Sequence, residues 1–328
     1  MDYSTRITGL NEILDVTTTD ANANGDVQVL AITADKVETI NVDGDAALTL
    51  TAVNADDTLV TIDGSDMTAG ALTFTTTGVA TAQTVTGGAG DDLFSIYDLS
   101  VNDYLDGGDG TDRVSLNNLN TWSNIVLGAD AQGKLVGTID GVALNLISIE
   151  GLSAFNGGRG DDVVDVTGLD YAGPVTLQGR YGADYFVSGD FNDYFSLDDL
   201  SGADHLDGGL GVDRAWLGDR QTTEDIVLTA DANGDLAGTI GLEILDINSI
   251  EWLQGFQGGS GNDTVDASNL SGQGSAGLYG YNGNDSLIGG DSNDNLQGGS
   301  GNDSLTGGLG NDSLNGGADA DTFIFSNG

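Results

Sequence analysis

The chain has 328 residues, with 52 acidic side chains against 8 basic ones and a formal net charge of −44. This balance excludes nucleic acid as a partner, because there is no basic patch to meet the phosphates. Without Cys the chain forms no disulfides, and without a run of about 18 apolar residues it is not expected to insert into a membrane.

Aspartate accounts for almost all of the acidity. Six of the 52 acids are Glu, so 46 are Asp, the shorter acid that tight turns favour. Such a charge destabilises a compact chain by self-repulsion unless counter-ions bind. High net charge is also typical of disorder, but 38% of the residues are apolar and they recur periodically. The composition therefore predicts a chain that is unfolded without metal and folded with it.

Residues 1–86 are rich in Thr, Ala, Val and Asp and alternate apolar with polar residues in short runs. The runs cover 37–42, 48–53, 59–63, 72–76 and 83–86, with turn residues between them. Runs spaced in this way predict the rungs of a β-solenoid. The segment 1–14 lacks the basic start and the apolar core of a secretory signal peptide.

A large internal duplication follows, with an offset of 101 residues and no gap. The segment 107–116 (GGDGTDRVSL) matches 208–217 (GGLGVDRAWL), and 148–165 matches 249–266. The copies cover 87–187 and 188–288. Aspartates that close a turn pair across them: Asp92 with Asp193, Asp103 with Asp204, Asp112 with Asp213, Asp162 with Asp263, and Asp184 with Asp285. The turns at Asp103, Asp193 and Asp204 are degenerate, and same-side spacings of 20 or 22 residues predict a wide, irregular coil.

Each copy also contains an excursion of 50 residues between acid positions. Within it, 125–129 with 135–139, and 226–230 with 236–240, predict a β-hairpin. Asp231, Asn233 and Asp235 resemble a calcium loop, but the first copy has Gln132 and Lys134 at the matching places, so a turn is favoured over a ligand set. The tryptophans are expected to pack in the core or at its edge: Trp122, Trp216 and Trp252.

The last part of the chain is a nonapeptide ladder. Units at 280–324 read GYNGNDSLI, GGDSNDNLQ, GGSGNDSLT, GGLGNDSLN and GGADADTFI. An aspartate recurs every nine residues: Asp285, Asp294, Asp303, Asp312 and Asp321. An apolar residue follows each of them two places later: Leu287, Leu296, Leu305, Leu314 and Phe323. A flexible linker would not keep an apolar residue in register with an acid, so the period predicts one repeated structure.

The unit has the chemistry of a cation site. Glycines such as Gly283, Gly301 and Gly310 accept a positive φ and leave backbone carbonyls exposed as ligands. The residue before the Asp is often Asn, which tolerates the same region. The aspartate adds a carboxylate, and the next three residues are enough for a short strand. Calcium accepts mixed shells of carboxylate and carbonyl oxygen, whereas magnesium demands a stricter octahedron. Several Ca²⁺ ions are therefore predicted.

The ladder resembles the GGxGxDxUx repeat of RTX proteins, the haemolysin-type calcium-binding family. The resemblance implies a parallel β-roll in which two units make one coil and ions lie between stacked turns. Asp285, Asp303 and Asp321 would then line one flank, and Asp294 and Asp312 the other. Leu287, Leu305 and Phe323 would stack on one side of the core, and Leu296 and Leu314 on the other. Ser292 and Asp319 replace the second turn glycine, which predicts weaker binding there.

The segments VETINV and ATAQTVTGGAGDD, in the first 92 residues, resemble rungs of bacterial surface-layer proteins that end in RTX-type repeats. We therefore divide the chain into solenoid-like rungs at 1–86, RTX-type copies at 87–187 and 188–288, and a regular β-roll at 289–328. The resemblance implies export from a Gram-negative bacterium by type I secretion. The chain ends without the C-terminal signal of that route, so a fragment is expected.

An all-β, calcium-binding extracellular structural protein that assembles on itself in a surface lattice is the predicted function. Cell-surface polysaccharide is a second expected partner. The alternative is a calcium-binding module or stalk of a larger secreted adhesin or enzyme. Catalysis is not expected, because His205 is the single histidine, interpreted as a solvated turn residue, and neither HExxH nor GxSxG occurs. Paired acids such as Asp91 and Asp92 resemble a glycosidase pair, but they lie in calcium turns.

Overall fold

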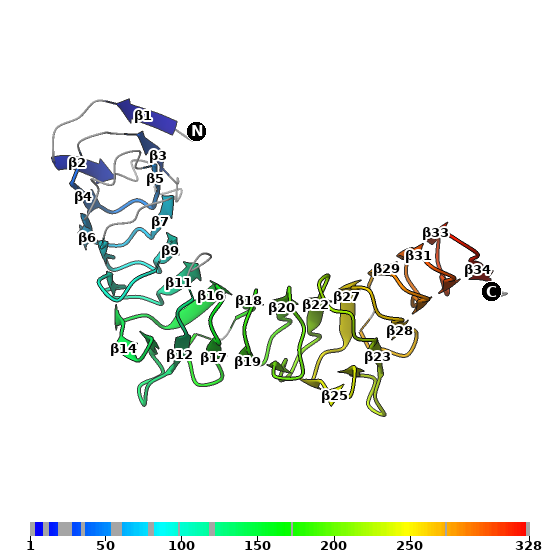
Figure 1. Cartoon of the computed structure of the whole chain (residues 1–328). Coiled ribbons are helices and arrows are strands. Elements are labelled where there is room, and N and C mark those ends of the chain that lie inside the picture. The colour runs from blue at the N-terminus through cyan, green and yellow to red at the C-terminus, as the bar shows by residue number, and fades with distance from the viewer. Residues whose placement is uncertain are drawn as a thin grey trace. The chain divides into compact units, whose positions relative to one another are not determined.

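The computed structural model describes residues 4–8, 13–18, 28–33, 37–53, 61–77, 82–97, 99–117, 122–171, 173–272 and 274–325. All regular structure in these residues is β, and most strand pairs are parallel (Figure 1). The all-β parallel solenoid is confirmed. Among the described residues no helix is long and apolar enough to cross a membrane.

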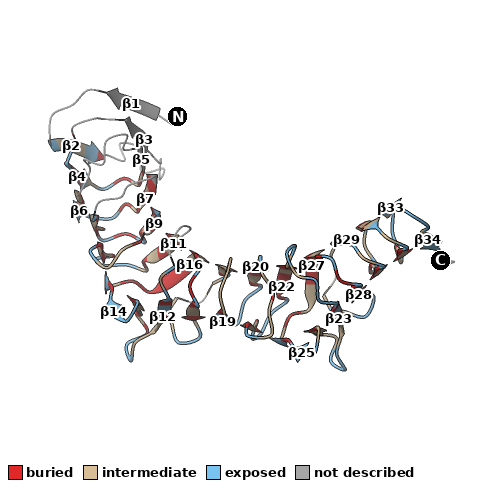
Figure 2. Ribbon diagram, viewed as in Figure 1, coloured by how far each residue is buried: buried red, intermediate tan, exposed pale blue. Residues whose placement is uncertain are grey.

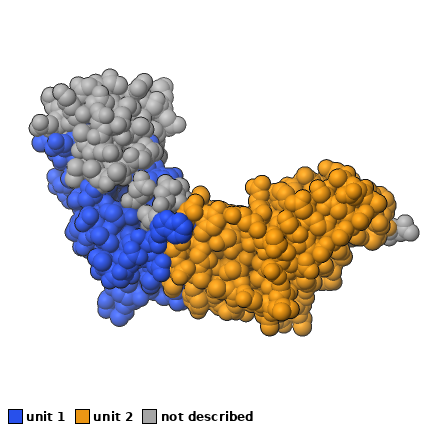
Figure 3. All heavy atoms as spheres, in the orientation of Figure 1, with its two compact units in different colours: residues 1–158, 165–173 blue, residues 159–164, 174–328 orange. Residues whose placement is uncertain are grey.

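Two compact units divide the chain: residues 1–158 with 165–173, and residues 159–164 with 174–328 (Figure 3). This division falls inside the first copy of the duplication. The four domains assigned from the sequence describe repeats and stay predictions.

Unit 1 consists of two parallel sheets that alternate along the chain, and of one hairpin. The first sheet runs β1 (Ser4–Thr8), β3 (Gln28–Thr33), β5 (Leu48–Val53), β7 (Leu72–Thr77), β9 (Leu93–Tyr97), β11 (Arg113–Asn117) and β16 (Gly151–Asn156). The second runs β15 (Asn145–Ile147), β10 (Tyr104–Asp106), β8 (Thr84–Thr86), β6 (Thr61–Met67), β4 (Thr39–Gly44) and β2 (Ile13–Thr18). The hairpin is β12 (Ile125–Ala129) and β13 (Leu135–Ile139), followed by β14 (Val142–Ala143).

Unit 2 repeats this plan. One sheet contains β18 (Thr176–Gln178), β20 (Tyr194–Leu197), β22 (Arg214–Gly218), β27 (Trp252–Gln257), β29 (Gly277–Asn282), β31 (Asn295–Ser300) and β33 (Ser313–Ala318). Facing strands are β17 (Val163–Asp165), β19 (Tyr185–Val187), β21 (His205–Asp207) and β26 (Asp246–Asn248). Another sheet contains β25 (Glu243–Ile244), β24 (Leu236–Ile240), β23 (Ile226–Ala230), β28 (Thr264–Asp266), β30 (Ser286–Ile288), β32 (Ser304–Thr306) and β34 (Thr322–Ile324).

The core is a set of columns in which each coil stacks one apolar side chain on that of the coil before. In unit 1, Leu50 pairs with Phe74 and Phe74 with Phe94, and all three side chains are fully buried. In strands such as β9 and β11 buried and partly exposed residues alternate, because successive side chains point to opposite faces (Figure 2). The predicted rungs at 37–86 are therefore strands of the solenoid, although residues 59 and 60 lie outside the described residues.

The C-terminal ladder stacks in the predicted register. Leu287 pairs with Leu305 and Leu305 with Phe323 on one side. Leu278, Leu296 and Leu314 form the column on the other side.

Both excursions form the predicted antiparallel hairpins, and the turn of each is held by an aspartate. Asp231 Oδ1 accepts the backbone N–H groups of Asn233 and Asp235 at 2.7 and 3.1 Å. These hydrogen bonds to the charged form lower the pKa of Asp231. Asp130 accepts the corresponding N–H groups of the first copy. The aspartate is thus occupied with its own turn, as the turn interpretation predicted.

The tryptophans differ in their surroundings. Trp122 is 75% exposed, so its assignment to the core or its edge is wrong. Trp216 and Trp252 pack on the outer surface of the sheet in unit 2 and are partly exposed.

Leu305→Ala should destabilise the C-terminal coils by about 2–5 kcal/mol, because it leaves a cavity in a fully buried column. Leu309→Ala is the matched control, since Leu309 lies in the next turn and is 49% exposed. Its effect should stay within about 0.5 kcal/mol. Thermal unfolding of both variants in excess calcium checks the difference, and equal losses would contradict the register of the column.

Candidate calcium-binding turns

The repeat aspartates form ladders that run between coils. Each stands directly before a strand. In many of them Oδ1 accepts the backbone N–H of the aspartate one coil earlier, whereas in Asp92 and Asp294 it accepts that of Leu72 and Ala276. The N–H of Asp263 donates to Asp285 Oδ1 at 2.8 Å, that of Asp285 to Asp303 at 2.8 Å, and that of Asp303 to Asp321 at 3.1 Å. The side chain of each coil therefore holds the backbone of its neighbour.

The same bond recurs throughout both copies, and it brings the predicted site residues into columns. The further aspartate-to-aspartate bonds join Asp92 to Asp112, Asp162 to Asp184, Asp184 to Asp204, Asp193 to Asp213, and Asp294 to Asp312. The predicted separation of flanks is correct in the ladder, where Asp294 and Asp312 lie in a different column from Asp285, Asp303 and Asp321.

Two glutamates belong to these columns, and the sequence interpretation missed them. The N–H of Asp112 donates to Glu150 Oε2 at 2.6 Å, and the N–H of Asp213 donates to Glu251 Oε2 at 2.7 Å. Both glutamates follow a hairpin excursion, where no nonapeptide pattern marks the turn. Their recurrence at an offset of 101 residues was the available signal. In the first copy the Lys134 ammonium also lies 2.6 Å from Glu150 and 3.2 Å from Asp170.

The second oxygen of many repeat aspartates is buried without a partner. Among the described residues, no hydrogen-bond donor reaches Oδ2 of Asp112, Asp184, Asp213, Asp263, Asp285 and Asp303. A buried carboxylate oxygen without a donor is costly and calls for a compensating group such as an ion.

Burial also makes these carboxyl groups hard to ionise. It raises the pKa of Asp285 from 3.8 to about 7, with the charges of Asp263 and Asp303 adding to the effect. Desolvation first, and acidic neighbours after it, raise the pKa of Asp184 and Asp213 to about 8. A bound cation removes this penalty by pairing with the carboxylate. The columns are therefore built for positive charge that the chain itself does not supply.

Other aspartates have donors on both oxygens. Gly88 N–H donates to Oδ2 of Asp92, and Gly290 N–H to Oδ2 of Asp294, each at 2.8 Å. In the degenerate turns Ser100 and Ser201 donate to Oδ2 of Asp103 and Asp204. These serines complete the turn with hydrogen bonds. The ligand set stays a prediction, and the aspartates whose second oxygen has no donor are its strongest candidates.

The first glycine of each unit leaves room for that oxygen. A side-chain carbon on Gly280 would collide with Asp285 Oδ2 and lie 2.8 Å from the carbonyl oxygen of Gly298 in the next coil. Gly258 has the same relation to Asp263 and to the Gly280 carbonyl. A carboxylate oxygen and a backbone carbonyl oxygen therefore converge at one place in these two turns, where any larger residue would block them.

The second turn glycine adopts a positive φ, as predicted: Gly283 at 124°, Gly301 at 128° and Gly310 at 116°. Asp319, which replaces this glycine in the last unit, is held at φ 79°. Such a conformation is strained for a residue with a side chain.

The described asparagines do not use the left-handed region that this residue type tolerates. Outside glycine, positive φ values in the described residues occur at Asp140, Ser148, Ser249, Tyr281 and Asp319. The asparagines instead form a ladder of their own, in which Asn284 Oδ1 accepts the N–H of Asn302 at 2.8 Å. Asn262 and Asn293 accept in the same way from Asn284 and Asn311.

The oxygen ligands available in the turns suit calcium. In the described part of the chain, no three His, Cys, Asp or Glu side chains converge on one point. An ion would therefore combine one or two carboxylate oxygens with backbone carbonyls, a mixed oxygen shell that Ca²⁺ accepts.

A family model of the RTX calcium-binding nonapeptide repeat, which spans four copies of the repeat, matches residues 96–120, 170–195, 256–269, 278–296 and 288–323. The chain carries RTX repeats. These repeats bind several calcium ions, so the chain is a calcium-binding protein. No curated protein matches the sequence. Asp92, Asp162, Asp204 and Asp213 lie outside the matched segments, yet they belong to the same columns of hydrogen bonds.

His205 differs from its prediction as a solvated turn residue. It lies in strand β21, its ring stacks on that of Tyr185 at 4.1 Å between centroids, and its Nδ1 is 2.7 Å from Asp246 Oδ2. This contact lowers the pKa of Asp246. The histidine thus belongs to a column of stacked coils and not to an RTX turn.

In a chelator, the stability of the folded chain should fall as pH rises from about 4 to about 8. Burial raises the folded-state pKa of Asp285 to about 7 and that of Asp184 to about 8. Within this window the folded chain holds protons that the unfolded chain has already released, so each further rise in pH favours unfolding. Thermal unfolding in EDTA at several pH values measures this. A metal-free chain that gains stability toward pH 8 contradicts the raised values.

Asp303→Asn should lower the calcium affinity of the ladder by roughly tenfold or more, because ligand charge sets calcium affinity. The amide oxygen still accepts the N–H of Asp285, so the variant separates the lost charge from the hydrogen bond. Asp291→Asn is the control, since Asp291 lies in the same ladder and is exposed. Calcium titration followed by circular dichroism compares them, and similar midpoints would show that the buried charge is not a ligand.

Proposed function

We propose that the chain is an extracellular structural protein whose solenoid folds when calcium binds between its coils, and which then assembles on itself in a surface lattice. The observation that carries the calcium-driven step is the row of buried Oδ2 atoms without donors. Without a cation each coil must bury a charge or take up a proton. With one, the same oxygen becomes part of a coordination shell.

The magnitude of the effect is sufficient for such a role. One site at about 100 times its dissociation constant adds about 2.7 kcal/mol to the stability. Five independent sites would add roughly 13 kcal/mol, which is comparable with the whole stability of a typical domain, about 5–15 kcal/mol. Calcium is thus able to decide whether the solenoid is folded.

The repeats and the dependence of folding on calcium support an extracellular location. RTX repeats are typical of secreted bacterial proteins. In a compartment poor in calcium the sites are empty, and the chain stays unfolded for export through a type I channel of a Gram-negative cell. Calcium outside the cell then folds it and prevents its return.

Two exposed edge strands support self-assembly. Strands β14 and β25 lie at the edges of their sheets, and each carries exposed apolar side chains: Val142 is 55% exposed and Ile244 79%. Leu242 beside β25 is fully exposed. Each strand is only two residues long, so the contact would come from its exposed apolar side chains and not from strand pairing. The duplication presents this edge once per copy, so one chain offers two related contacts, as an array requires.

A second candidate shares the calcium chemistry. In it the chain is a module or stalk of a larger secreted adhesin or enzyme. RTX β-roll repeats are typically structural in either setting.

A calcium titration of the chain in chelator-treated buffer tests the proposal. The circular-dichroism signal of strands should appear with calcium, light scattering should rise at the same or higher calcium, and electron microscopy should show ordered sheets. Chelation should unfold 280–324 first. A strand signal that is unchanged in excess chelator overturns calcium-driven folding. Folding without any rise in scattering overturns self-assembly and favours the module of a larger protein.

A further inference from the structure

The outer face of one sheet in unit 2 carries a cluster of aromatic rings. Strands β20, β22, β27 and β29 alternate buried and outward residues, and the outward positions hold Tyr194, Arg214, Trp216, Trp252 and Tyr279. Arg214 lies between Tyr194 and Trp252 in register across three strands. Trp216 lies in register with Gly255, and Gly255 with Gly277.

Two of these rings lie over the backbone of glycines. A side-chain carbon on Gly255 would collide with the Trp216 ring, and one on Gly277 would lie 3.2 Å from Cε2 of Tyr279. The two ring centroids are 6.4 Å apart, with 35° between the planes. Both residues are partly exposed. The glycines thus let adjacent rings lie on the sheet and form a platform, which we define as Trp216 and Tyr279.

Guanidinium groups flank the platform. Arg214 lies over the rings of Tyr194 and Trp252 at 5.2 and 5.8 Å, and Arg220 over Tyr281 at 5.1 Å. Both arginines are exposed. The ion pairs among the described residues involve Lys134 and His205 and neither of these arginines. In a chain with 52 acids, two exposed guanidiniums without a carboxylate are available to an external one.

Hydrogen-bonding groups complete the surface. Asn295 Nδ2 donates to the Tyr279 hydroxyl at 3.1 Å, and Gln257 and Gln297 flank Tyr279 in register. Rings bordered by amides and guanidiniums suit a ligand with apolar C–H faces and many hydroxyl groups better than a purely apolar one.

The first copy provides a comparison within the same chain. At the offset of 101 residues, Ser115 stands for Trp216 and Gln178 for Tyr279. Arg113, the counterpart of Arg214, also stacks on an aromatic ring. Its partner is Tyr171, which packs over Gly151. In the second copy Trp252 replaces Gly151 and Gly272 replaces Tyr171. The arginine stack is thus common to both copies, whereas the platform belongs to the second alone.

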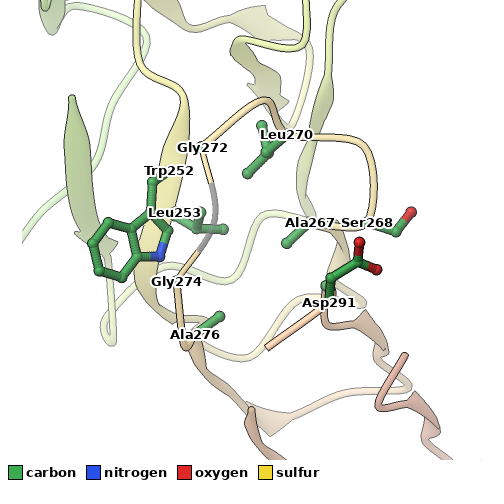
Figure 4. A pocket seen from close by; sticks show the side chains of 10 residues that line it. Trp252, Leu253, Ala267, Ser268, Leu270, Gly272, Gly274, Ala276 and Asp291 are labelled. Atoms are coloured by element: carbon green, nitrogen blue, oxygen red, sulfur yellow. The ribbon is translucent and has the colours of Figure 1, made fainter. Parts of the chain in front are cut away.

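The cavity beside Trp252 is too small to be the ligand site. It is lined by residues such as Leu253, Leu270 and Ala276 and has a volume of about 40 Å³ (Figure 4). This is room for a water molecule and not for a sugar. A ligand would therefore lie on the outer surface, where the Arg214 guanidinium stacks over the Trp252 ring.

We propose that this face binds an acidic polysaccharide. Sugar C–H groups stack on the negative faces of Trp216 and Tyr279, carboxylates pair with Arg214 and Arg220, and hydroxyl groups bond to the flanking amides. The site rests on the fold of unit 2 and does not require the lattice proposed above.

Short polygalacturonate oligomers are the probe, used with the full chain in calcium and followed by tryptophan fluorescence and calorimetry. The double variant W216S/Y279Q carries the residues of the first copy, which the same coil already tolerates. It should lose about tenfold or more in affinity with an unchanged circular-dichroism spectrum, and Trp122→Ser should lose none. Unchanged binding in W216S/Y279Q overturns the proposal, as does the absence of binding by the wild-type chain.

Two further measurements keep the test decisive. R220Q, in an exposed turn, should weaken binding of charged oligomers and not of neutral ones, which applies even if the double variant fails to fold. Sedimentation without sugar should show the same oligomeric state for wild type and W216S/Y279Q. A shift to smaller species in the variant would show that the face binds a second copy, and would overturn the sugar site.

Discussion

The stability of this solenoid depends on how buried aspartates are neutralised between coils. One carboxylate oxygen of each accepts the N–H of the previous coil, and in Asp285 and Asp303 the other is buried with no donor. The first bond fixes the distance between coils with backbone geometry. The second oxygen is buried without a partner, so this close stacking is unfavourable unless a cation binds. A bound cation would relieve this penalty, which is how a chain with a net charge of −44 would come to fold with calcium, as proposed above.

Departures from the repeat show the same constraint. Where the turn is degenerate, Ser100 and Ser201 supply donors to the second oxygen of Asp103 and Asp204. At the end of the excursion in the first copy, Glu150 replaces the aspartate and the Lys134 ammonium pairs with it. The chain thus uses a hydroxyl, an amide or an ammonium where it does not leave the oxygen for an ion. Each substitute gives the carboxylate oxygen a partner from the chain itself.

Much of this architecture could be predicted from the sequence, because a strict period repeats one structure. The stacking of Leu287 on Leu305, and the separation of Asp294 from Asp285, follow from nine-residue units paired into coils. Contacts across irregular spacing could not be predicted from the nine-residue period. Glu150 lies 38 residues from Asp112, beyond a hairpin, and the asparagine ladder depends on side-chain direction, which residue propensity does not give. His205 was misplaced because its partner Asp246 lies 41 residues away.

The duplication separates what the fold needs from what a particular copy adds. Hairpin turn, glutamate and arginine stack recur at the same offset, and the arginine stack survives although its aromatic partner moves from Tyr171 to Trp252. Such compensation is expected of a contact that the sheet requires. Trp216 and Tyr279 have no counterparts, and Ser115 and Gln178 fill the same positions without disturbing the coil. Their rings are therefore not a shared requirement of the two copies, which supports the role in surface recognition proposed above for two large aromatic groups over glycines.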